Sequence, residues 1–221
     1  GNFKEAGHIQ NRTIEFVLFL TVPAAFGLMM ISTEITRVLY ERGAFTPETT
    51  TLVAAIMTVY AFGLPAFALT KALQPAFYAR ENTKLPMRFT MIAVGINSIL
   101  AISLFPILAE RGIALAEVVS GWTNVILLST TLLISGHLKF DSLLMRRVPL
   151  IVLSGAAMAA AVKFAAVKLS AWFAPGAHFM QQFGGVLILM AIAMAVYFGL
   201  VLATGGVNRA LILKLVRRRR G

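Results

Sequence analysis

Lys71 is the residue whose type and position most suggest chemistry, because it lies inside a long apolar stretch where a charge is costly. Gln74 and Tyr78 follow it at helical spacing, so one helix face would carry an ammonium, an amide and a phenol. Such a face would be turned toward protein or toward a wet cavity. The alternative is that the Lys71 side chain extends along the helix and places its charge at the membrane surface.

A second polar face is predicted around Glu117 and Asn124, which are spaced so that they share one side of a helix. Asn97 and Thr90 mark a similar face on the preceding apolar stretch. Polar residues of this kind either hydrogen-bond a neighbouring helix or line a pathway across the membrane. Glu117 lies near the end of its stretch, so contact with water is a further alternative for it.

No pattern typical of a catalytic or metal centre accompanies these residues. The sequence has no cysteine, and His8, His137 and His178 fall in separate segments outside the apolar stretches, so no metal site is expected. P-loop, dinucleotide-binding and nucleophile-elbow patterns are absent from the sequence. We therefore expect no cofactor and no enzyme activity; catalysis would have to use scattered residues such as Lys71 and Glu117.

The composition indicates that lipid is the solvent for most of the chain. Hydrophobic residues make up 58% and charged residues 13%, whereas soluble domains are roughly half apolar and about a quarter charged. The formal net charge of +11 could suggest nucleic-acid binding. Basic residues here interrupt apolar runs and do not cover a water-facing surface, so we expect no nucleic-acid partner.

Six apolar runs are long enough to cross a hydrocarbon core, which takes about 20 residues of helix. They cover approximately residues 14–31, 52–79, 87–108, 112–135, 148–170 and 183–203. Each must be helical, because lipid offers the backbone no hydrogen-bond partners. The sequence thus predicts an all-α fold, a polytopic transmembrane bundle that forms a single region over residues 1–221.

Two features suggest irregularities in these helices. Pro23, Pro65, Pro75 and Pro106 fall inside or near the runs and predict bends, which serve either packing or a broken helix beside a pathway. The stretch Ser32–Gly43 is amphipathic and is predicted to be the outer end of the first helix, lying along the membrane interface.

The basic residues divide unequally between the two sides of the predicted membrane. Both chain ends and the loops near 80–88 and 136–147 hold fourteen: Lys4, Arg12, Arg80, Lys84, Arg88, Lys139, Arg146, Arg147, Arg209, Lys214, Arg217, Arg218, Arg219 and Arg220. The opposite segments hold five: Arg37, Arg42, Arg111, Lys163 and Lys168. Because basic loops stay inside, we expect both termini in the cytoplasm. The four terminal arginines either bind anionic lipid headgroups or serve only as a topology signal.

Two loop segments carry a family resemblance. The first is Arg-Gly-Ala-Phe-Thr, which contains Arg42, Gly43 and Phe45. The second runs from Pro75 to Pro86, and its matching residues are Pro75, Phe77, Tyr78, Thr83, Lys84 and Pro86. In this order and separation they resemble the MurJ (MviN) family of bacterial lipid II flippases, and the resemblance extends over essentially the whole chain.

The resemblance implies a piece of a larger protein with fourteen spanning helices in the bacterial inner membrane. This chain looks like helices nine to fourteen, and the last pair would line a groove for the polyprenyl tail. The family's headgroup cavity is built mainly by earlier helices, so its headgroup-binding residues are expected outside this chain. The implied partners are lipid II, membrane lipids and the upstream helices.

The implied function is flipping of lipid II, the lipid-linked peptidoglycan precursor, by alternating access. Two alternatives stay open at this point. One is an exporter of another lipid-linked saccharide. The other is a membrane scaffold or remnant that transports nothing.

Overall fold

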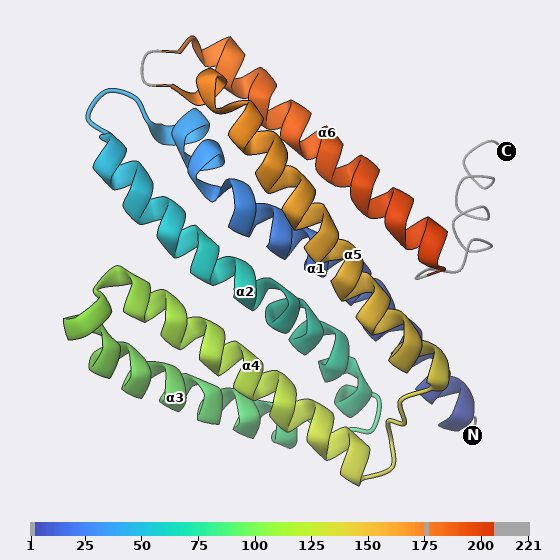
Figure 1. Cartoon of the computed structure of the whole chain (residues 1–221). Coiled ribbons are helices and arrows are strands. Elements are labelled where there is room, and N and C mark those ends of the chain that lie inside the picture. The colour runs from blue at the N-terminus through green and yellow to red at the C-terminus, as the bar shows by residue number, and fades with distance from the viewer. Residues whose placement is uncertain (1–2, 175–176, 206–221) are drawn as a thin grey trace, which may run out of the picture.

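Six long helices make up nearly all of the part of the chain that the structure describes. The computed structural model describes residues 3–174 and 177–205. In chain order the elements are α1 (Phe3–Tyr40), α2 (Pro47–Tyr78), α3 (Lys84–Leu108), α4 (Glu110–Ile134), α5 (Ser142–Lys168), the short 3-10 helix η1 (Ser170–Phe173) and α6 (Phe179–Thr204). Successive long helices run antiparallel (Figure 1). All six are long and apolar enough to cross a membrane, which confirms the predicted all-α bundle of about six long apolar helices.

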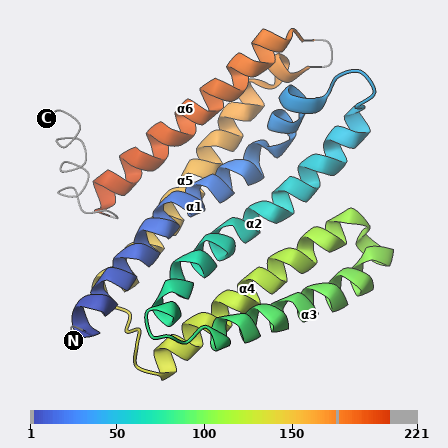
Figure 2. The ribbon, with the colours of Figure 1, turned by 180° about the vertical axis from the view of Figure 1, so that it is seen from behind.

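Two apolar clusters hold the helices together, and α1 contributes to both. One cluster joins α1, α5 and α6 and includes the buried residues Phe19 and Leu189. The other joins α1, α2, α4 and α5 around Leu73 and Leu128. α3 packs mainly on α4 and lies at the edge of the bundle, as the view from behind shows (Figure 2). Because α1 and α5 both contribute to the two clusters, their positions fix how the two halves of the bundle meet.

The α3–α4 connection is the shortest between two long helices of the described chain, because only Ala109 separates them. Ala109 adopts a left-handed φ of 49° between the two helices, and Gly112 follows immediately inside α4. A Cβ atom at Gly112 would lie 2.8 Å from the backbone carbonyl of Leu104. Glycine is therefore required here, because any side chain would push α4 away from α3.

α1 continues beyond the apolar run 14–31 into the segment predicted as its outer end, and its irregular point is not at proline. The backbone leaves helical values at Ile31 (φ −123°, ψ 22°), whereas the helix passes through Pro23. Beyond this kink lies the amphipathic segment 32–43. Its Val38 is 3% exposed and belongs to the cluster that includes Phe173. Part of the apolar face thus packs within the bundle, and its alignment along the membrane interface stays a prediction.

The antiparallel order separates the predicted loop sets to opposite ends of the bundle (Figure 1). The start of α1, the 79–83 turn, the 135–141 loop and the end of α6 share one end. The 41–46 turn, the α3–α4 connection and the α5–α6 connection share the other. The terminal arginines Arg217, Arg218, Arg219 and Arg220 lie outside the described residues. That the more basic end faces the cytoplasm stays a prediction.

Single cysteines provide a direct test of this orientation, because the chain has no cysteine of its own. Lys84→Cys and His137→Cys lie at the basic end, and Ala44→Cys and His178→Cys lie at the other; all four positions are exposed. In intact cells, an impermeant maleimide should label only the variants at 44 and 178. In permeabilised cells the maleimide should label all four variants. Labelling of the variant at 84 in intact cells would invert the topology.

Candidate functional site

The polar residues predicted on separate helix faces meet in one open cavity. α2, α3 and α4 enclose a space of about 310 Å³. Its polar lining consists of Thr70, Lys71, Thr90, Asn97, Glu117, Ser120 and Asn124. Four of the six polar candidates chosen from the sequence (Lys71, Asn97, Glu117 and Asn124) are therefore neighbours in space. Gln74 and Tyr78 are not part of the lining, although they follow Lys71 at helical spacing.

Asn97 and Glu117 link the two walls of this cavity. The Asn97 Nδ2 atom donates a hydrogen bond of 2.6 Å to Glu117 Oε2, and so joins α3 to α4. Hydrogen bonds to a charged group are stronger than neutral ones. On α4 itself, the Ser120 hydroxyl donates to the Glu117 carbonyl oxygen at 2.8 Å. The Glu117 carboxylate is thus held at the cavity wall by a neutral amide.

Asn124 and Lys71 retain unused hydrogen-bonding capacity in the same cavity. Asn124 is 8% exposed, and its Oδ1 atom has no hydrogen-bond partner among the described residues. Lys71 lines the cavity from α2 and forms no ion pair within that part of the chain. A buried acceptor without a partner costs about 1–3 kcal/mol. The cavity therefore offers a hydrogen-bond acceptor and a cationic donor to a polar group that enters it.

Phe67 was missed as a site residue, and it shapes the floor of the cavity. Its ring fits against two glycines, because a Cβ at Gly63 or at Gly121 would lie 2.6–2.7 Å from ring atoms. These glycines allow α2 and α4 to approach each other closely around the ring. Glycines inside two apolar stretches were the sequence signal for this approach.

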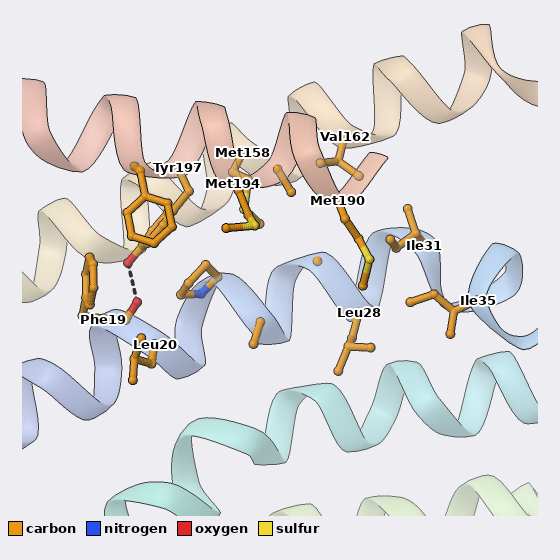
Figure 3. A pocket seen from close by; sticks show the side chains of 15 residues that line it. Phe19, Leu20, Leu28, Ile31, Ile35, Met158, Val162, Met190, Met194 and Tyr197 are labelled. Carbon is orange, nitrogen blue, oxygen red and sulfur yellow. Dashed lines mark hydrogen bonds between the residues drawn. The ribbon is translucent and has the colours of Figure 1, made fainter. Parts of the chain in front are cut away.

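A second hollow of about 390 Å³ lies between α1, α5 and α6 and is almost wholly apolar (Figure 3). Met158 of α5 and Met190 and Met194 of α6 point into it, opposite Leu28 and Ile31 of α1. Flexible thioether side chains adapt to irregular apolar ligands. The last two helices were expected to line a groove, but the contribution of α1 was not expected.

The groove is held together by a hydrogen bond that proline makes available. Pro23 has no N–H, so the carbonyl oxygen of Phe19, four residues earlier, has no donor within α1. The Tyr197 hydroxyl of α6 donates to this oxygen at 2.7 Å (Figure 3). The Phe19 and Tyr197 rings also contact each other, with centroids 5.6 Å apart. This bond fixes α6 against α1 at one end of the groove.

Comparison with known proteins decides the family. A family model described as lipid II flippase MurJ matches residues 1–184 of the chain. The chain belongs to the MurJ family. A probable lipid II flippase MurJ of Rhizobium tropici is 50% identical over 220 residues, covering 100% of this chain and 41% of that protein. Its counterpart from Rhizobium meliloti is 45% identical, covering 99% of this chain and 41% of that protein.

A solved MurJ structure agrees with the fold. The lipid II flippase MurJ in an inward closed conformation aligns with a TM-score of 0.67 at 26% identity, covering 89% of this chain and 38% of that one. The chain spans about two fifths of the length of the curated relatives it matches, and the matched region is their C-terminal part. It is therefore a multi-pass membrane protein of this family, as the two loop segments predicted.

The first MurJ-like loop ties α1 to the start of α6. Gly43 adopts a left-handed φ of +60° that turns the chain out of α1. The Arg42 guanidinium lies 4.3 Å from the centre of the Phe179 ring, an attractive arrangement of a cation over an aromatic face. The Phe45 ring packs 5.9 Å from that of Tyr40. These motif residues have a structural role at one end of the bundle.

The second MurJ-like loop forms the turn from α2 into α3. Phe77 is 4% exposed and its carbonyl oxygen accepts from the Asn82 N–H at 3.1 Å. The Asn82 side chain then accepts from Leu85 N at 3.3 Å, whereas Thr83 precedes the helix without a side-chain cap. Asn82, which is not among the matching motif residues, therefore supplies the side-chain acceptor at the start of α3. Pro86 is buried; Pro75, Tyr78, Thr83 and Lys84 are exposed.

Tyr197→Phe should destabilise the folded chain by about 1 kcal/mol, because it removes one interhelical hydrogen bond in an apolar environment. The matched background is Pro23→Ala, which restores a backbone N–H for the Phe19 carbonyl oxygen. In that background the loss at Tyr197 should shrink, since the oxygen then has a partner within α1. Reversible unfolding in mixed micelles measures the free energy of unfolding of the unaltered chain, the two single variants and the double variant. An equal loss in both backgrounds would contradict the proline argument.

Proposed function

We propose that this chain is the C-terminal part of a lipid II flippase of the bacterial inner membrane. The proposal rests on one observation above all. The same bundle holds a polar cavity between α2, α3 and α4 and a separate apolar groove between α1, α5 and α6. A lipid-linked saccharide has the same two parts, a polar headgroup and a long apolar tail.

The apolar groove suits the tail. Its walls carry methionines and aromatic rings, and burial of an isoprenoid chain there would replace contacts with lipid by contacts with protein. A tail held in this groove would remain at membrane depth while the headgroup changes sides. The groove therefore contributes positioning, not chemistry, and the chain acts as a transporter without forming or breaking a covalent bond.

The polar cavity between α2, α3 and α4 would lie beside the pathway that the headgroup takes. Lys71 and the unpartnered oxygen of Asn124 would interact with polar groups that pass or dock there. We assign the main headgroup-binding residues to helices that precede the matched region in the relatives. Alternating access would then arise as this bundle and the preceding helices rock against each other. The relatives are described as probable lipid II flippases, which does not favour another lipid-linked saccharide or a scaffold that transports nothing.

Rescue of cells depleted of their own lipid II flippase tests the proposal. The chain alone should not restore growth. The chain fused behind the preceding part of the Rhizobium tropici relative should restore it, because the missing helices would complete the headgroup cavity. Membrane levels of both proteins are compared by immunoblot. Growth with the chain alone would show that six helices suffice, and a fusion that inserts but fails to rescue would argue against the function.

Two glycines test the tail groove in that rescuing fusion. Gly27→Leu should lower flipping by roughly tenfold, since its side chain would enter the groove and exclude the tail; displaced apolar contacts of this size are worth about 1–3 kcal/mol. A Cβ at Gly27 meets nothing within 4 Å, so the fold tolerates it. Gly199→Leu is the matched control, because its Cβ is equally free and it lies outside the groove lining. Equal flipping by both variants would exclude this route for the tail.

A further inference from the structure

α4 and α5 are joined by a short loop, yet they make little direct contact with each other. Each packs instead on an earlier helix, α4 on α2 and α5 on α1. An apolar crevice of about 360 Å³ lies between the two pairs. Its walls include Leu73, Ser129, Leu144 and Val148. Phe140 at its rim is 43% exposed, so the crevice opens to the surroundings of the bundle.

A polar hollow of similar size, about 360 Å³, lies at the basic end of the bundle. His8 and Asn11 of α1 line it, together with His137, Lys139 and Asp141 of the α4–α5 loop. The Lys139 ammonium and the His137 ring form no hydrogen bond or ion pair within the described residues. Both are therefore available to bind an anion.

The polar hollow and the apolar crevice share walls. Along the loop, Lys139 and Asp141 line the hollow, and Phe140 between them lines the crevice. Along α1, Asn11 lines the hollow and Ile14, nearly one turn further along the helix, lines the crevice. The two spaces thus adjoin, with the polar one at the bundle end and the apolar one at membrane depth.

The polar hollow is braced by hydrogen bonds, and its acidic group, Asp141, is already paired. Asn11 is 2% exposed, and its Nδ2 atom donates to the carbonyl oxygen of Lys139 at 2.8 Å. Asp141 Oδ1 accepts from the Leu144 N–H at 2.7 Å, and Oδ2 pairs with the Arg12 guanidinium. His8 Nδ1 lies 3.8 Å from the same carboxylate. With Asp141 neutralised by Arg12, the charge left over is that of Lys139, which is complementary to a phosphate.

We propose that this pair of spaces binds an anionic glycerophospholipid, with its phosphate at Lys139 and His137 and one acyl chain in the crevice beside Phe140. A glycerophospholipid likewise has a polar headgroup at the membrane surface and apolar chains at membrane depth. The hollow lies at the end of the bundle where basic residues gather. The site is separate from the groove of α1, α5 and α6, with which it shares no lining residue. It would fill the space that α4 and α5 leave between them.

Photocrosslinking in nanodiscs tests the proposal. Discs of phosphatidylcholine with a minority of phosphatidylglycerol receive a trace of phosphatidylglycerol that carries a diazirine on one acyl chain. Cross-links should map to the peptide that contains Phe140–Val148. Lys139→Glu should lower them about fivefold, as expected for losing one charge contact near the surface. Arg146→Glu, a charge reversal at an exposed residue of the same end that lines neither space, should leave them unchanged.

A crevice-filling variant keeps the test independent of charge. Ser129→Phe should abolish the cross-links by occupying the acyl site, whereas Ser103→Phe, exposed on α3, should not. Helicity by circular dichroism identifies a misfolded variant, in which case Lys139→Glu decides. The same probes are applied to the fusion with the preceding helices. Absence of cross-links at this peptide in either protein, equal labelling by a phosphatidylcholine probe, or equal loss with Arg146→Glu would overturn the proposal.

Discussion

In a hydrocarbon environment every backbone N–H and C=O needs a partner within the protein, and much of this structure follows from that requirement. Within the described residues, six long helices satisfy most of these groups internally. Pro23 creates an exception at the Phe19 carbonyl oxygen, and the Tyr197 hydroxyl of α6 supplies the missing donor. A defect in one helix thus becomes a specific contact with another. The hydrogen bond holds α6 against α1, and these two helices form part of the wall of the apolar groove.

The same requirement decides which polar side chains are informative. Threonine hydroxyls inside these helices commonly bond to the carbonyl four residues earlier, as Thr21 does with Val17 and Thr70 with Ala66. A hydroxyl bonded in this way needs no partner on another helix, although Thr58 also meets the Ser32 hydroxyl of α1 at 2.9 Å. Asn97 and Asn124 cannot be satisfied in this way, and they lie where helices meet or where a cavity opens. Amides and charges in the spans were consequently better guides to the site than hydroxyls.

Much of the fold could be predicted because hydropathy and helix length are local properties, and the six spans were located from them. The polar cavity was predictable only in part. Lys71, Asn97, Glu117 and Asn124 share it, but Gln74 and Tyr78 do not, since a helical stripe does not tell where along its length a neighbour lies. The α1 wall of the groove depends on how distant segments pack, which one sequence does not encode locally.

The kink at Ile31 shows a similar limit. Proline was the expected cause of a bend in α1, because it removes a backbone hydrogen bond. The Phe19 oxygen at Pro23 found a partner in Tyr197, and helical geometry persists there. Ile31, without any such signal, is where the backbone departs from helical values, next to the groove that its side chain lines. Tertiary packing, not residue type, thus places the bend.

Basic residues at this end of the bundle either form ion pairs that join helices or stay free to set the orientation. A count of basic residues does not separate these two roles. Glu15 is 7% exposed and lies between Arg12 and Arg147, which joins α1 to the start of α5. Removing one member of such a buried network typically costs about 3–5 kcal/mol, so these two arginines would be needed even without a topology signal. Lys84, Arg88 and Arg146 remain exposed. The charge left to set orientation is therefore smaller than the fourteen basic residues of that end suggest, although its excess over the opposite end persists.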